Sequence, residues 1–134
     1  MQAQQDPKLL SPLTLAFVGD GVYELLVRKS IVEMGSMPAK ALNARKVELV
    51  RASSQAAVYD GLESVLTDSE REILKRGRNA HTGSVPKNAL VADYHKATGL
   101  EALFGFLYLA GEHARLQSLF QQAMQISRER MKEE

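Results

Sequence analysis

The sequence predicts an all-α fold, with one compact domain of about six helices. Apolar residues recur at helical spacing along most of the chain, no stretch competes with the alternating pattern of a strand, and we find no internal repeat or linker. The 134 residues, 45% of them hydrophobic and 25% charged, match the size and composition of one globular domain. We therefore expect residues 1–134 to form a single domain with a core at about 10–125.

The first helix is predicted to begin at Ser11 and Pro12, because serine is a favoured N-cap and proline suits the first helical position. Gly35 is expected to end it. Its apolar positions are Phe17, Val22, Leu25, Leu26 and Ile31.

A second helix is predicted from near Pro38 to about Asp60. It has an apolar side, and its other side is basic. The basic residues are Lys40, Arg45, Lys46 and Arg51.

Thr67 and Glu70 fit a capping box, so a short helix is expected to follow to about Lys75. The glycines, proline and polar residues of 76–88 predict one long loop. Helical periodicity resumes over about 89–96 and again from Leu100. The last helix is expected from about Glu112 to Met131, with four inward-facing residues: Leu116, Leu119, Phe120 and Ala123.

The chain contains no cysteine, which excludes disulfides, thiolate zinc sites and cysteine nucleophiles. The first ten residues lack the features of a signal peptide, and no apolar run approaches the length of a membrane span. We expect a soluble, cytoplasmic protein with no membrane partner.

Two carboxylates stand in apolar surroundings. Asp20 lies between Gly19 and Gly21 in an apolar helix, and Glu101 is the only charge for about ten residues. A buried carboxylate without partners costs several kcal/mol, so it usually meets a cation, accepts hydrogen bonds or holds a proton. The alternative is a solvated carboxylate, or for Glu101 a place in the first turn of a helix after Gly99.

The pattern of these segments resembles the ribonuclease III catalytic domain. A Gly-Asp in an apolar helix is followed about 80 residues later by a Glu-Ala-Leu helix, with the basic run KRGRNAHTGSVPKN between them. That run and the compact length resemble the Mini-III branch of the family, over about Leu10 to Gln125. The resemblance implies a magnesium-dependent endoribonuclease that cuts double-stranded RNA, with Asp20 and Glu101 as catalytic residues and Mg²⁺ ligands.

The sequence departs from the family at two acidic positions, which are Ala16 and Thr98 here. The expected site is therefore poor in carboxylates, although Mg²⁺ keeps several waters and often takes only one or two carboxylates. Glu24 lies one helical turn beyond Asp20, where it could either assist the ion or pair with Arg28.

The net charge is only +1, so binding to RNA needs a local basic surface. No acidic residue lies between Glu72 and Asp93. We expect the basic groups of this stretch to contact phosphates and its asparagines to reach sugar hydroxyls, unless the stretch is only a solvated connector. The predicted RNA-binding residues are Lys75, Arg76, Arg78, Asn79, Lys87 and Asn88.

The resemblance further implies a homodimer whose two sites each cut one strand, and maturation of the 23S ribosomal RNA precursor with help from a large-subunit ribosomal protein. The apolar residues Leu103, Phe104, Phe106 and Leu107 fit either a dimer interface or the centre of the domain. Two other interpretations remain. One is a catalytically weakened relative that binds RNA or assists ribosome assembly, and the other is an all-α interaction protein unrelated to RNA.

Overall fold

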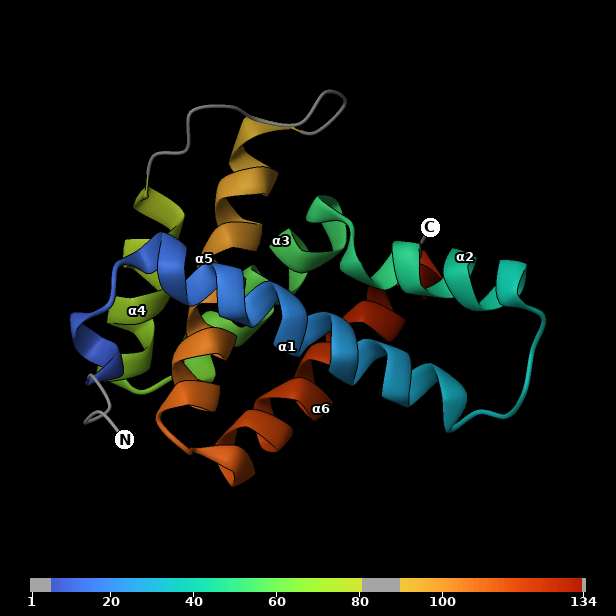
Figure 1. Ribbon diagram of the computed structural model, residues 1–134. Coiled ribbons are helices and arrows are strands. Elements are labelled where there is room, and N and C mark those ends of the chain that lie inside the picture. The colour runs from blue at the N-terminus through green and yellow to red at the C-terminus, as the bar shows by residue number, and fades with distance from the viewer. Residues whose placement is uncertain (1–5, 81–89, 134) are drawn as a thin grey trace.

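Helix α5 (Val91–Leu109) runs through the centre of the fold, and α1 (Pro12–Val32), α3 (Ala52–Leu62), α4 (Asp68–Asn79) and α6 (His113–Glu133) pack around it (Figure 1). The computed structural model describes residues 6–80 and 90–133. In these ranges every regular element is helical, including two short 3-10 helices at Pro7–Leu9 and Glu63–Val65. The all-α prediction is confirmed.

The helix starts predicted from capping residues are confirmed. The Ser11 hydroxyl accepts a hydrogen bond from the backbone N–H of Thr14 at 3.2 Å, and Pro12 opens α1. At α4 the Thr67 hydroxyl accepts from the N–H of Glu70, whose carboxylate accepts from the N–H of Thr67. These bonds satisfy backbone donors that the first turn of a helix leaves free.

The middle of α5 is buried on all sides. Residues 102–107 are all buried, because α1, α3, α4 and α6 each cover part of the helix. Leu103, Phe104, Phe106 and Leu107 therefore belong to the core of one protomer, and the interpretation of these residues as an interface is wrong.

The predicted helix from Pro38 to Asp60 is two helices, α2 (Ala39–Val50) and α3. Arg51 between them is extended, with ψ 156°. The Gln55 amide donates to the carbonyl of Val50 at 2.8 Å, and the Ser54 hydroxyl donates to that of Glu48. Side chains at the start of α3 thus satisfy carbonyls at the end of α2, which stabilises the break. None of the twelve described residues of α2 is buried, whereas α3 buries six.

Two other boundaries differ from expectation. Helix α4 continues to Asn79, so Arg76, Arg78 and Asn79 lie on a helix and not in a loop. Helix α5 is continuous from Val91, which puts Glu101 in its middle and not in a first turn. None of the helices in the described part of the chain is long and apolar enough to cross a membrane.

The buried side of α1 was predicted only in part. Ile31 is buried, but Phe17 is 83% exposed and Leu25 is 68% exposed. Helix α1 instead turns Ala16 and Gly19 toward the core, because small residues on that side allow a close approach to α5.

Candidate active site

Helices α1 and α5 touch backbone to backbone through two glycines. A Cβ atom added to Gly19 would lie 1.6 Å from the carbonyl oxygen of Glu101, and one added to Gly105 would lie 2.0 Å from that of Leu15. No larger residue fits at either position without moving a helix. Asp20 follows Gly19 directly, so this crossing brings Asp20 and Glu101 together although they are far apart in the sequence.

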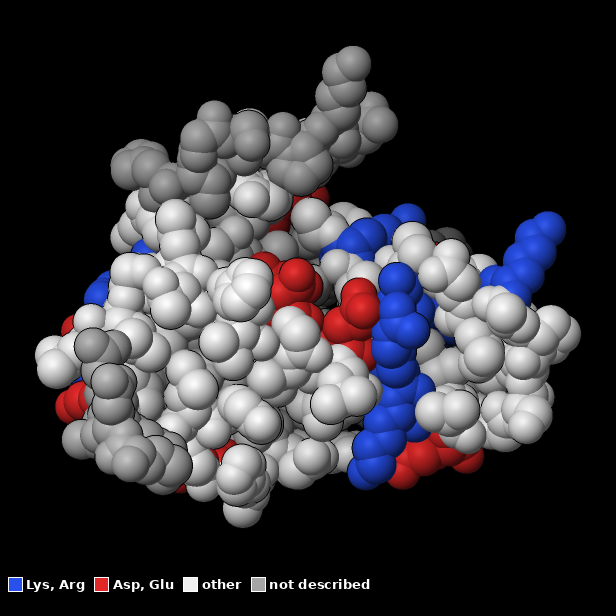
Figure 2. Space-filling model, in the orientation of Figure 1, with Lys and Arg blue, Asp and Glu red and all other residues white. Residues whose placement is uncertain are grey.

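Asp20 perturbs the carboxyl group of Glu101. Asp20 is exposed, while Glu101 is half-buried. Burial raises the pKa of Glu101 from its ordinary 4.5 to about 8, and the charge of Asp20 and a hydrogen bond with it add to this rise. Without a cation, the pair therefore holds a proton at neutral pH. Figure 2 shows acidic side chains at the centre of this face.

Gln55 of α3 is a site residue that sequence reasoning missed. It is 4% exposed, and its amide donates to the Glu101 carboxylate at 3.5 Å as well as to the carbonyl of Val50. Its side-chain oxygen is buried with no hydrogen-bond partner among the described residues. The amide opposes the rise in the pKa of Glu101 and restricts the orientation of the carboxylate. No sequence signal marks Gln55, because its burial depends on the break between α2 and α3.

The two departures from the family pattern do not add ligands. Ala16 is buried, and the hydroxyl of Thr98 donates to the carbonyl of Tyr94 at 3.0 Å. Within the described ranges no group of three or more His, Cys, Asp or Glu residues could hold a metal ion. Two carboxylates, one of them open to solvent, still fit Mg²⁺, which retains waters in most protein sites.

Glu24 pairs with cations, as one of the two interpretations predicted. Its carboxylate accepts from the Arg28 guanidinium at 3.1 Å, and the Lys46 ammonium of α2 lies 3.7 Å from its other oxygen. Glu24 therefore lies one helical turn beyond Asp20, and its carboxylate is already paired with Arg28 and Lys46.

The predicted RNA-binding residues of the described chain lie at the end of α4. Lys75, Arg76 and Asn79 line a shallow surface depression. The guanidinium of Arg78 lies 6.0 Å from the centroid of the Tyr59 ring and also donates to the Asn79 side chain at 3.2 Å. Within the described ranges no hydrogen bond or ion pair joins these residues to Asp20 or Glu101. Lys87 and Asn88 lie outside the described residues.

Comparison with known proteins agrees with this architecture. The family model of the ribonuclease III domain matches residues 13–112. The Mini-ribonuclease 3 of Thermoanaerobacter sp. is 42% identical over 90% of this chain and 84% of its own length, and that of Staphylococcus aureus is 43% identical over 97% of this chain and 100% of its own. The chain belongs to the Mini-ribonuclease 3 group of the ribonuclease III family. As a member of this family it is an endoribonuclease.

The family assignment extends to the three-dimensional structure. A crystal structure of a protein from Fusobacterium nucleatum is similar with a TM-score of 0.81 and 30% identity, and it covers 91% of this chain and 98% of that one. The two proteins thus share one fold over nearly all of both chains.

The raised pKa of Glu101 predicts that stability depends on pH. Between its ordinary pKa of 4.5 and the folded value of about 8, the folded state binds more protons than the unfolded state. This contribution is fully present below pH 4.5 and is lost as the pH rises through 8. We expect the Tm of the protein in EDTA to fall between pH 6 and pH 9. The Tm of Glu101→Gln should fall much less over the same range. Thermal melts followed by circular dichroism measure it, and the same pH dependence in both proteins would contradict the prediction.

Proposed function

We propose that this chain is a magnesium-dependent endoribonuclease of double-stranded RNA, with Asp20 and Glu101 as its catalytic, metal-binding residues. The main support is the contact at Gly19 and Gly105, which holds two carboxylates together, and within residues 6–80 and 90–133 neither carboxylate forms an ion pair with Lys or Arg. The pair offers oxygen ligands of the kind that Mg²⁺ prefers, and binding of the ion would displace the proton on Glu101.

The bound ion would activate a water molecule and stabilise charge on the phosphodiester. The protein supplies the rest of the arrangement. Asp20, which is exposed, presents its carboxylate to solvent and substrate. Gln55 restrains Glu101 through its amide, so little reorganisation is required when the carboxylate ionises.

In this proposal Lys75, Arg76 and Arg78 contact RNA phosphates, and Asn79 contacts sugar hydroxyls. Lys87 and Asn88 are included as RNA-binding residues on the basis of the sequence alone. The proposed substrate is the 23S ribosomal RNA precursor in the cytoplasm, with assistance from a large-subunit ribosomal protein.

The test is to incubate the purified protein with a long RNA duplex labelled on both strands, with Mg²⁺ or with EDTA. We expect shortened duplexes with staggered ends only when Mg²⁺ is present. Retention of the duplex without cleavage under both conditions would support the alternative, a catalytically weakened RNA-binding factor, for which Ala16 and Thr98 are the evidence. Equal cleavage in EDTA would refute the role of the metal.

We further propose that the protein acts as a homodimer through the outer side of α1. Phe17 is 83% exposed, and Leu13, one turn earlier, is 39% exposed. Much of the surface over the N-terminal half of α1 is uncharged, and it adjoins the acidic centre of the face (Figures 1 and 2). A second copy on this surface would bury apolar area and bring two Asp20 and Glu101 pairs to one duplex.

Sedimentation equilibrium at micromolar concentration should give twice the 14.8 kDa mass of the chain. Phe17→Glu should give a monomer, because it places a charge in the proposed interface. Val65→Glu is a matched control at another exposed apolar residue, which is 45% exposed, and should leave the dimer intact. A wild-type monomer that still makes paired cuts would refute the dimer.

A further inference from the structure

One carboxylate, that of Glu24, holds two cations from two different helices. The Arg28 guanidinium donates to one carboxylate oxygen through Nε and approaches it with Nη2, both at 3.1 Å. The Lys46 ammonium lies 3.7 Å from the other oxygen. The cluster therefore carries a net charge of about +1, since one negative charge opposes two positive ones.

The two cations are restrained to different degrees. The side chain of Lys46 is only 19% exposed, and it lies among apolar residues of α1 and α2 that include Ile31 and Leu42. Its ammonium therefore has few alternative positions. The side chain of Arg28 is 58% exposed, and a guanidinium has five N–H donors, so several remain available after it binds Glu24.

The cluster lies beside the candidate active site. Glu24 follows Asp20 by four residues on α1, which is about 6 Å along the helix axis. In Figure 2 a column of Lys and Arg atoms lies next to the acidic centre of the face, in the region where Figure 1 shows α1 and α2. A polyanion with one phosphate at Asp20 would therefore meet this positive charge about one helical turn away, where it would suit a neighbouring phosphate.

Docking of α2 on α1 does not by itself explain the cluster. The ion pair between Lys46 and Glu24 joins the two helices, whereas the ion pair of Arg28 with Glu24 lies within α1. An exposed i,i+4 pair contributes little to stability. What Arg28 adds is a second, outward-facing set of donors, suited to phosphate oxygens.

We propose that Arg28 and Lys46, positioned by Glu24, form a binding site for an RNA backbone phosphate next to the one that is cut. The proposal rests on the proposed function, because the neighbouring phosphate is defined by cleavage at Asp20 and Glu101. It makes Glu24 a positioning residue without a role in metal binding. It also adds a phosphate contact separate from the basic end of α4.

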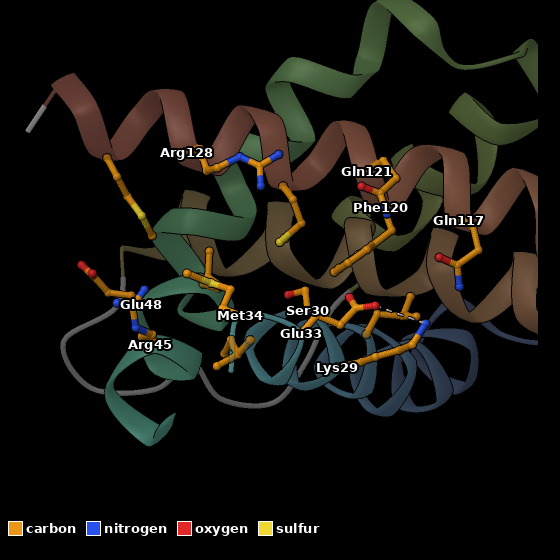
Figure 3. A pocket seen from close by; sticks show the side chains of 15 residues that line it. Lys29, Ser30, Glu33, Met34, Arg45, Glu48, Gln117, Phe120, Gln121 and Arg128 are labelled. Atoms are coloured by element: carbon orange, nitrogen blue, oxygen red, sulfur yellow. Dashed lines mark ion pairs between the residues drawn. The ribbon is translucent and has the colours of Figure 1, made fainter. Parts of the chain in front are cut away.

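The chain offers a matched control next to each cation. Lys29 follows Arg28 on α1, and Arg45 precedes Lys46 on α2, but both lie in a different place, a groove between α1, α2 and α6 (Figure 3). There Lys29 pairs with Glu33 at 4.0 Å. Replacing each of these four residues by Gln removes the same charge from the same two helices.

The experiment measures binding of a short RNA duplex in EDTA, where cleavage does not interfere, over a range of salt concentrations. Arg28→Gln and Lys46→Gln should each weaken binding severalfold and reduce the slope of log affinity against log salt by about one unit. Lys29→Gln and Arg45→Gln should change that slope clearly less. In cleavage assays the first two variants should raise KM more than they lower kcat, and Lys46→Arg should restore most of the affinity.

Glu24→Gln completes the test. It should alter KM, while the Mg²⁺ concentration for half-maximal cleavage stays close to that of the wild type. A large rise in that Mg²⁺ concentration would overturn the proposal in favour of a metal-binding role for Glu24. Wild-type affinity and salt slope in Arg28→Gln and Lys46→Gln would also overturn it. If the proposed function itself is wrong, the wild type will show no Mg²⁺-dependent cleavage. The binding measurements in EDTA do not depend on cleavage and remain interpretable in that case.

Discussion

Asp20→Asn is expected to reduce cleavage of duplex RNA by about a thousandfold, which corresponds to about 4 kcal/mol of lost transition-state stabilisation. The amide has nearly the shape of the carboxylate but lacks the charge that would hold Mg²⁺. Because Asp20 is exposed, the fold and the binding of RNA in EDTA should be retained. Single-turnover cleavage at saturating Mg²⁺ is the measurement, and Glu101→Gln should give a similar loss.

Glu33→Gln serves as the control, because it removes one exposed carboxylate just beyond the end of the same helix. It should cleave at nearly the rate of the wild type. If Asp20→Asn did so as well, Asp20 could not be a metal ligand, and the proposed mechanism would fail.

Gly19→Ala should destabilise the protein by about 3 kcal/mol or more, at the upper end of what overpacking usually costs. The added methyl group would lie 1.6 Å from the carbonyl oxygen of Glu101, and a backbone atom cannot move aside by changing rotamer. We expect the Tm to fall by about 10 °C. Thermal or urea unfolding measures the effect.

Gly21→Ala provides a close comparison on the same helix. A Cβ atom at Gly21 would meet no described atom within 4 Å apart from the neighbouring backbone of its own helix, so the change should stabilise α1 by up to about 1 kcal/mol through helix propensity. If both variants unfolded alike, the backbone contact between α1 and α5 would not be what constrains position 19.

The sequence predicted those parts of the fold that local interactions determine. The starts of α1 and α4 follow from Ser11 and from Thr67 with Glu70, whose hydrogen bonds reach only three residues along the chain. Features that depend on contacts between helices were missed. The break at Arg51 depends on side chains of the next helix, and the exposure of Phe17 depends on which side of α1 can approach α5 closely.

The candidate site shows the same division. Asp20 and Glu101 could be selected from the sequence because each is a charge in an apolar helix and because the surrounding pattern resembles the ribonuclease III domain, and the structure brings them together. Gln55 could not be selected, since an uncharged polar residue in a helix gives no signal until its partners are known. The ion pair between Glu24 and Lys46 likewise joins residues whose proximity depends on how α2 packs.

The glycine contact between α1 and α5 has a consequence for how the family can diverge. Since the separation of Asp20 and Glu101 is determined by main-chain atoms at Gly19 and Gly105, exchanges of core side chains elsewhere leave that separation largely unchanged. Relatives 42% identical to this chain have replaced more than half of the aligned residues. Substitutions in such a protein should affect its stability well before they affect the geometry of the carboxylate pair. The scaffold can therefore accumulate neutral changes while the arrangement of the two carboxylates stays under a separate and much narrower constraint.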